Sequence, residues 1–382
     1  MNVKSWHIWD FPDNIYVLIK KEVREEFFNE MYKKFGSQKN YAKFLNKDRI
    51  SIQKYHYARS WDHRKKHVSF MPLKILHKSL HFMNEKLKSK IENNILELRC
   101  RVGNPMKLNL PIKESPELYR IVAHILGDGS ATKRKVPYYS NTCKELREKF
   151  KEDLKILGNI KSYERDYTNV PIVCFQKPLA EILSHILKIS FIDKENIPKR
   201  LFETLNDSKI AFLQALFDDE GTISTNLAIC MKSKNILKEI KDLLLSLDIE
   251  SGKISLKPKS TGSFGEITYT LSIKAKFIKD FKEKIGFLHP EKSRKLNVRL
   301  KIIERNLVQR TRPLEWSRDK ILKLLTIKPM LALELCEELL LTLSHMHRHL
   351  KYLENKDFIE RTGYKNRLIW KIKDQGLVQI HS

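Results

Sequence analysis

The chain has 382 residues and carries 73 Lys and Arg against 46 Asp and Glu, a formal net charge of +27. This length allows two or three domains, each large enough for a core, and the basic surplus is too lopsided for balanced ion-pair networks alone. The basic residues run along the whole chain rather than in one tail, so we expect several modules that face nucleic acid.

The cysteines, the first twenty residues and the length of the apolar runs indicate the cellular compartment. The five cysteines lie far apart without CxxC spacing, so the sequence indicates neither a zinc site nor a disulfide framework. Charges interrupt the first twenty residues, unlike a signal peptide, and no apolar run reaches membrane-spanning length. We expect a cytoplasmic, nucleoid-associated protein with no membrane partner. The chain runs from Met1 to Ser382 without the asparagine that cyclises at the end of an intein, so self-splicing is not expected.

The N-terminal quarter predicts a short lead-in, residues 1–20, and an all-α helix-turn-helix domain, residues 21–95. Apolar residues recur at helical spacing from Lys21 and stop at Gly36, and Ser37 caps a second short helix. A third helix follows a polar turn, which is the order of elements in a helix-turn-helix.

That third helix, over residues 50–60, would enter the major groove. A small structural bundle with solvated charges is the alternative. Residues 96–114 predict an extended linker. The DNA contacts that we expect on the third helix are Gln53, His56 and Arg59.

Two apolar segments end in acidic residues followed by glycine, one over residues 121–129 and one over residues 212–221. Ser115, Pro116 and Glu117 mark the start of the first helix. The dipole makes the C-terminal end of a helix negative, so acids there are unfavourable unless a cation binds.

Small residues let these two helices pack closely: Ala123 and Gly127 lie four apart on the first, and Ala215 lies on the second. Packed in this way, the helices would bring Asp128 and Glu220 together at one end of the seam. Two carboxylates and the last helix carbonyls form a hard oxygen site that suits Mg²⁺. The alternative is a pair of ordinary buried helices with solvated acidic ends.

The order of elements after the first acid recurs after the second, so residues 115–205 and 206–300 predict two copies of one unit. Each copy continues with strands, a helix, two more strands and a further helix. The copies also end alike, because Lys199 and Lys292 follow their acids at nearly the same separation in the chain. These lysines would place an amine at equivalent positions.

Both acidic segments resemble the LAGLIDADG motif of homing endonucleases, the second (Leu213 to Gly221) more faithfully. In that family the paired helices join two αββαββα halves, and the last acid of each motif binds the catalytic metal. The resemblance implies an α+β fold with a duplicated αββαββα saddle over residues 115–300, flanked by the helix-turn-helix and a winged helix. The implied metal ligands are Asp128 and Glu220, with Gly127 and Asp219 beside them.

The first motif departs from the family pattern. His124 stands where an aliphatic residue is usual, and Leu126 replaces the first acid. That earlier acid is not the metal ligand in the family, so the departure weakens the match without removing the chemistry.

Polar residues alternate along the strands of both copies, as expected for a concave face that reads DNA. A solvated strand face is the alternative for any single residue. The residues that we expect on the DNA face are Lys133, Arg134, Lys135, Tyr139 and Asn141 in the first copy, and Ser224, Asn226, Lys232, Lys253 and Lys257 in the second.

Residues 314–382 predict a winged helix, with three helical segments followed by a basic two-stranded hairpin. Residues 330–341 are apolar almost all round and indicate the buried helix of the group. The expected DNA contacts are Arg348 on the third helix and Lys365 and Arg367 on the wing.

Together with these patterns, the resemblance implies a monomeric, site-specific endonuclease for double-stranded DNA with internal pseudo-twofold symmetry. Asp128 and Glu220 would hold Mg²⁺, and Lys199 and Lys292 would polarise water or phosphate. One alternative is a DNA-binding transcriptional regulator that kept the saddle and lost cleavage, which the modules at both ends favour. Another is an RNA maturase for intron RNA, because charge does not separate RNA from DNA.

Overall fold

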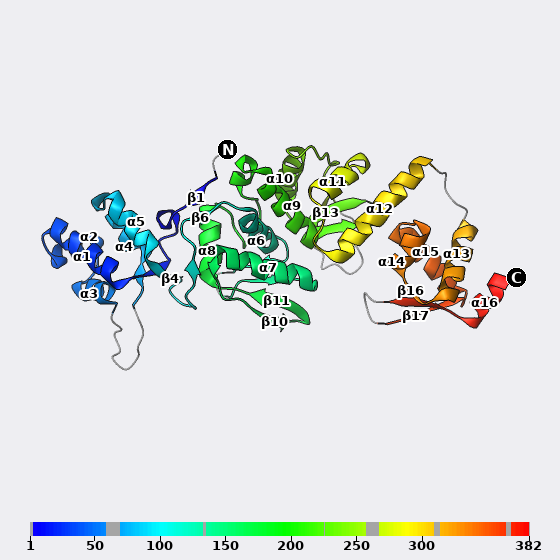
Figure 1. The fold of residues 1–382 in the computed structure, drawn as a ribbon, viewed down its shortest axis with the longest axis horizontal. Coiled ribbons are helices and arrows are strands. Elements are labelled where there is room, and N and C mark those ends of the chain that lie inside the picture. The colour runs from blue at the N-terminus through cyan, green and yellow to red at the C-terminus, as the bar shows by residue number, and fades with distance from the viewer. Residues whose placement is uncertain are drawn as a thin grey trace. The chain divides into compact units, whose positions relative to one another are not determined.

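The computed structural model describes residues 3–58, 69–132, 135–224, 226–256, 267–308, 314–363 and 368–381. The chain divides into two compact units, Met1–Asp219 and Glu220–Ser382. Each unit combines helices with small antiparallel sheets, which confirms the α+β class (Figure 1). No helix within the described ranges is long and apolar enough to span a membrane.

The predicted group of three helices lies near the start of the first unit: α1 (Lys21–Phe35), α2 (Gln38–Leu45) and α3 (Arg49–Tyr57). Gly36 ends α1 with a positive φ of 74°, which glycine adopts without steric cost. The Ser37 hydroxyl accepts a hydrogen bond from the Asn40 amide and so caps α2. Local capping chemistry therefore determines these helix ends, as the sequence predicts.

The N-terminal part is not all-α, and its predicted lead-in is folded. Strand β2 (Tyr16–Ile19) lies between β3 (Met71–Pro72) and β4 (Ile95–Arg99) in an antiparallel sheet. Val17 and Ile19 are buried while Tyr16 is half-buried, the two-residue period of a strand with one covered face. Strand β2 is only four residues long and has charged neighbours, so its two-residue period was not recognised in the sequence.

Shorter elements complete this region. Helices α4 (Leu73–Ser79) and α5 (Glu85–Asn93) follow β3. The predicted linker is extended, but its strands are paired: β5 (Lys107–Leu108) pairs with β9 (Gly158–Asn159), and β6 (Ile112–Lys113) pairs with β1 (Ser5–Trp6). These pairings attach the N-terminal region to the first αββαββα copy.

The first copy is built on helix α6 (Pro116–Leu126), and α7 packs on β11 within it (Figure 1). Its sheet has the order β10-β11-β8-β7, with all neighbours antiparallel. The other elements are β7 (Gly129–Ser130), β8 (Tyr138–Ser140), α7 (Lys144–Leu157), β10 (Tyr163–Tyr167), β11 (Val170–Cys174), α8 (Lys177–Ile186) and the short helix η3 (Lys199–Glu203).

The second copy starts with α9 (Asn206–Glu220), whose last residue opens the second unit. Its sheet order, β12-β13-β15-β14, has the same connectivity as the first sheet, β7-β8-β11-β10 read from its other edge. The elements are β12 (Gly221–Ile223), β13 (Leu227–Met231), α10 (Lys234–Leu245), β14 (Ser255–Leu256), β15 (Tyr269–Ser272) and α11 (Ile278–Lys284).

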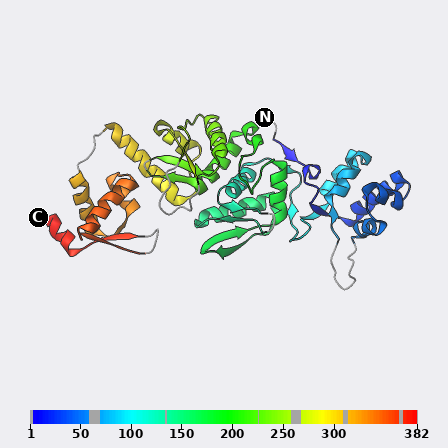
Figure 2. The ribbon, with the colours of Figure 1, turned by 180° about the vertical axis from the view of Figure 1, so that it is seen from behind.

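A long helix that the sequence did not predict, α12 (Pro290–Val308, yellow in Figure 2), follows the second copy. It packs against β12. Its Val298 and Ile302 enter the hydrophobic core of the C-terminal module. The Arg305 guanidinium donates to the carbonyl of Leu340 at 2.8 Å, and Leu340 caps the C-terminal end of α14 (Ala332–Leu339). Helix α12 thus contacts both the second αββαββα copy and the C-terminal module.

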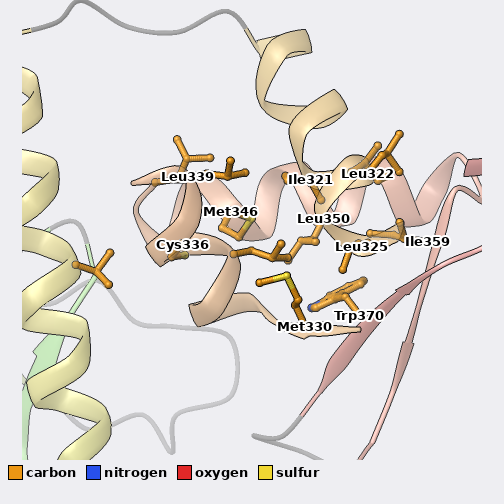
Figure 3. Packing of buried hydrophobic residues seen from close by; sticks show 14 of the residues in the cluster. Ile321, Leu322, Leu325, Met330, Cys336, Leu339, Met346, Leu350, Ile359 and Trp370 are labelled. Atoms are coloured by element: carbon orange, nitrogen blue, oxygen red, sulfur yellow. The ribbon is translucent and has the colours of Figure 1, made fainter. Parts of the chain in front are cut away.

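The C-terminal module packs three helices on a three-stranded sheet of order β16-β18-β17. Met346 and Leu350 of α15 face Leu325 and Trp370 in its core (Figure 3). The described elements are α13 (Leu314–Ile327), β16 (Met330–Leu331), α14 (Ala332–Leu339), α15 (Leu343–Asn355), β17 (Ile359–Thr362), β18 (Ile369–Ile372) and α16 (Asp374–His381). The predicted helices are present, and the hairpin has an added short strand.

A buried carboxylate, Glu114, connects the N-terminal strand to α6 and η3. It accepts hydrogen bonds from the Lys4 amide at 3.1 Å, the Tyr119 hydroxyl at 2.7 Å and the Arg200 guanidinium at 3.1 Å. Burial acts to raise the pKa of Glu114, but the hydrogen bonds from Arg200 and Tyr119 outweigh it and leave the pKa lowered.

Glu114→Gln is expected to lower the free energy of unfolding by about 1–3 kcal/mol at pH 7, because it removes charge-assisted hydrogen bonds. The lowered pKa means that this stabilisation is present above the unfolded pKa of about 4.3 and is lost as pH falls through the folded value. Urea unfolding of wild type and variant between pH 7 and pH 3 should therefore give curves that converge in acid. The exposed Glu338→Gln is the control, and a difference that stays constant with pH would contradict the assignment.

Candidate metal and DNA-binding site

Inside the first unit, Gly127 lets the end of α6 approach α9, and Gly129 lets the chain that follows α6 turn back against that helix. A Cβ on Gly127 would lie 2.9 Å from both Cβ and Oδ2 of Asp219, and a Cβ on Gly129 would lie 2.5 Å from Cα of Ile125. Both separations are shorter than real Cβ contacts, so neither position accepts a larger residue without movement. The close approach predicted from the small residues therefore occurs at this end of the helices.

The Asp219 side chain is fully inaccessible and is held by three groups of the first copy. The Tyr139 hydroxyl donates to Oδ1 at 2.7 Å, Asn141 Nδ2 donates to the same oxygen at 3.2 Å, and His124 Nδ1 lies 2.9 Å from Oδ2. Burial, and then the Asp219 carboxylate, raise the pKa of Tyr139, so its hydroxyl stays protonated and donates. His124, the departure from the family pattern, is thus the partner of a buried acid.

Asn141 connects this buried network to the surface. Its Nδ2 also donates to Oδ2 of Asp128 at 3.2 Å, and the two hydrogens of one amide nitrogen can serve the two carboxylates. Asp128 is exposed, whereas Asp219 is not. The exposed carboxylate is therefore oriented by a chain of side chains that ends in the core.

A lysine that the sequence did not single out binds the end of α6. Lys194 Nζ donates to the carbonyl oxygens of Gly127 at 2.9 Å and Gly129 at 2.7 Å. Lys194 lies in a loop with no helical or strand period, so no pattern in the sequence could have identified it. Lys199 is exposed at the start of η3, and Lys292 lies on α12. Their catalytic roles stay predictions.

The two predicted metal ligands, Asp128 and Glu220, belong to different compact units. Glu220 is half-buried at the end of α9 and is the first residue of the second unit. The predicted meeting of Asp128 with Glu220 joins residues of the two units and stays a prediction. Within the first unit, Asp128 is linked instead to Asp219, through Asn141.

The donor set at the end of α6 fits a hard divalent cation. An exposed Asp128 carboxylate and the adjacent Gly127 carbonyl are oxygen donors, and Mg²⁺ commonly binds one or two carboxylates and completes its shell with phosphate oxygens and water. Among the described residues, no group of three or more His, Cys, Asp and Glu forms a ready metal cluster. A cation at this site would therefore need ligands from nucleic acid or solvent.

Two residues predicted to contact DNA are buried, and those predictions are wrong. Tyr139 is 0% exposed, because β8 directs Tyr138 and Ser140 to the other face. Successive side chains of a strand point to opposite faces, so an error of one residue exchanges the buried and the exposed positions. His56 is 6% exposed and stacks on Phe28, which places it in the core of the three-helix group.

The other predicted contacts divide by position. Asn141 and Gln53 are half-buried. Lys135, Ser224, Asn226, Lys232, Lys253 and Arg348 are exposed, as DNA contacts must be. Arg59, Lys133, Arg134, Lys257, Lys365 and Arg367 lie outside the described residues.

Comparison with known proteins gives the same motif. Residues 207–286, which run from the first turn of α9 to the end of α11, match the LAGLIDADG-like domain family. The chain is 29% identical over 206 residues to the glutamine–fructose-6-phosphate aminotransferase of Methanocaldococcus jannaschii, which covers 50% of this chain and 18% of that protein. It is 26% identical over 256 residues to the DNA polymerase of Thermococcus litoralis, covering 59% of this chain and 14% of that protein. The chain thus spans less than a fifth of either relative.

Three solved structures are similar over part of the chain. I-DmoI in complex with DNA and Mn has a TM-score of 0.33 at 15% identity, covering 45% of this chain and 96% of its own. The homing endonuclease I-WcaI bound to its DNA recognition sequence has a TM-score of 0.33 at 15% identity, covering 48% and 86%. Full-length DUF199/WhiA from Thermatoga maritima has a TM-score of 0.33 at 18% identity, covering 65% and 93%.

Proposed function

We propose that the protein is a Mg²⁺-dependent, site-specific endonuclease of double-stranded DNA that acts as a monomer with two related halves. The observation that carries this proposal is the exposed Asp128 carboxylate at the end of a buried helix, oriented by Asn141 from a network rooted in the core. The match of the second copy to the LAGLIDADG-like domain family and the net charge of +27 support it.

In this proposal Asp128 and the Gly127 carbonyl hold one divalent ion, and Glu220 holds its counterpart in the second copy. A bound Mg²⁺ supplies an activated water and stabilises the charge that develops on the leaving oxygen. The chain's own residues orient and bind: Asn141 fixes the Asp128 carboxylate, and exposed strand residues such as Lys135 bind the phosphate backbone. The chain thereby supplies position and charge for in-line hydrolysis.

Asp128→Asn is expected to reduce cleavage by at least about a thousandfold while leaving DNA binding within a few-fold, because the amide cannot replace a carboxylate ligand. The measurement is strand cleavage of a genomic DNA library with Mg²⁺, paired with a binding assay in Ca²⁺. Asp166→Asn, an exposed acid on β10 of the same unit, is the control. Equal cleavage by wild type and Asp128→Asn would exclude the role of Asp128, and an uncut library would exclude the nuclease itself.

A DNA-binding regulator without cleavage is the second candidate. Two observations favour it: Asp219 is fully engaged inside the protein, and the Gly127 carbonyl already binds an ammonium group. The same pair of assays separates the candidates, because a regulator binds its selected DNA and never cuts it. Preference for intron RNA over duplex DNA in the binding assay would instead favour a maturase.

The curated relatives support a role for this region that is separate from their named activities. One is an aminotransferase and the other is a DNA polymerase, yet each shares with this chain a segment of less than a fifth of its own length. Since the two named activities differ, we assign neither of them to this chain.

A further inference from the structure

The ammonium group of Lys194 lies where a cation bound to the end of α6 would lie. It donates to the carbonyls of Gly127 and Gly129, the two residues on either side of Asp128. Carbonyls at the end of a helix have no partners inside the helix, and the dipole makes this end negative. A positive group here therefore satisfies two backbone acceptors and balances the adjacent carboxylate.

A hydrogen-bonded turn holds the backbone of the loop that carries Lys194. Lys194 has a positive φ of 50°, in the left-handed region that a non-glycine residue enters at a cost. The Lys194 amide donates to the Ser190 carbonyl at 3.2 Å, and the Ser190 hydroxyl donates to Asp193 at 2.9 Å and accepts from its amide. The closed turn therefore fixes the backbone from which the Lys194 side chain extends.

The carbonyl oxygen of Gly127 binds the Lys194 ammonium group in the structure and a divalent ion in the proposed metal site. The proposed metal site uses the Gly127 carbonyl and the Asp128 carboxylate, and Lys194 Nζ is 2.9 Å from that carbonyl. A carbonyl oxygen has two lone pairs, so an ammonium group and a divalent ion that both bound it would lie side by side. The repulsion between these positive charges disfavours simultaneous binding, so the two cations compete.

We propose that Lys194 is a tethered cation that competes with the divalent ion for the carbonyl end of α6, and that binding of the ion displaces it. This inference rests on the proposed function, because it takes that metal site as given. Without metal, Lys194 neutralises the site and stabilises the end of α6. With metal, the displaced ammonium pairs with a phosphate oxygen of the DNA backbone, so metal and DNA bind cooperatively.

The test is Mn²⁺ binding to the full-length chain, measured by isothermal titration calorimetry for wild type and Lys194→Met. Removal of the competitor is expected to lower the Kd for Mn²⁺ by about tenfold or more, and the double variant with Asp128→Asn should lose this binding. Lys194→Gly accepts the positive φ without strain and should behave like Lys194→Met, which separates loss of the charge from damage to the loop.

Lys188 supplies a matched control, because it is an exposed lysine in the same connecting segment with a positive φ of 54°. Lys188→Met and Lys188→Gly are expected to bind Mn²⁺ as wild type does. Unchanged or weaker Mn²⁺ binding by both Lys194 variants would overturn the competition, as would the absence of Mn²⁺ binding in every variant. Cleavage by wild type in the library assay would still stand in either case, so the two proposals fail separately.

Discussion

Gly129→Ala is expected to destabilise the first unit by at least about 3 kcal/mol. The added Cβ would lie 2.5 Å from Cα of Ile125 and 2.9 Å from its carbonyl oxygen, with the His124 carbonyl at 3.0 Å. All three are backbone atoms of α6, so no side-chain rotation relieves the overlap. Inserting atoms into packed regions typically costs about 1–3 kcal/mol and more where the backbone must move.

The measurement is the free energy of unfolding from urea titration, with Gly252→Ala as the control. A Cβ at Gly252 meets only the Ser272 carbonyl, at the ordinary distance of 3.6 Å, so its effect is expected to stay below about 1 kcal/mol. Equal stability of the two variants would show that the end of α6 has more room than the structure gives it. Loss of soluble Gly129→Ala protein, with Gly252→Ala intact, would agree with the prediction.

Asp219→Ala is expected to cost about 3–5 kcal/mol of stability, the second large effect. It removes at once the acceptor of the Tyr139 hydroxyl, one acceptor of Asn141 and the partner of His124 Nδ1. His124 Nε2 is already buried with no hydrogen-bond partner among the described residues, so the variant would leave both nitrogens of that ring unpaired. Breaking a buried pair by removing one partner is far more costly than losing a surface contact.

Asp207→Ala is the control for this variant, because Asp207 lies exposed in the first turn of the same helix. It is expected to lose only the few tenths of a kcal/mol that an acid contributes near a helix N-terminus. Thermal unfolding of both variants compares them. If Asp219→Ala were as stable as Asp207→Ala, the buried network would contribute nothing, and Asp128 would need another source of its orientation.

Helix α12 changes how the modules are divided. The sequence places a boundary between residue 300 and residue 314, but Val298 and Ile302 belong to the core of the C-terminal module. The Arg294 guanidinium of α12 also forms a bidentate ion pair with the Glu337 carboxylate of α14. A C-terminal module cut off after α12 would expose the apolar face that this helix covers, so the second unit should be expressed whole.

Much of the fold followed from local chemistry in the sequence. Gly36 and Ser37 mark the boundary between α1 and α2, and Ser115 with Pro116 begins α6, because capping and backbone preference act within a few residues. The apolar segments that end in acid, and the recurrence of their elements, identified both copies and the exposed Asp128. These features depend on neighbours in the chain, so one sequence was enough to predict them.

The tertiary structure alone decided which side chains meet. The pairing of Asp219 with His124, Tyr139 and Asn141 joins residues about eighty or more positions apart, and no periodicity records such a contact. The face of β8 was set by packing, and an error of one residue turned Tyr139 from a surface residue into a buried donor. The contact of Lys194 with the end of α6 also could not be predicted, because Lys194 lies in a loop without a sequence pattern. The turns of such a loop and the surfaces it packs on determine where its side chains lie.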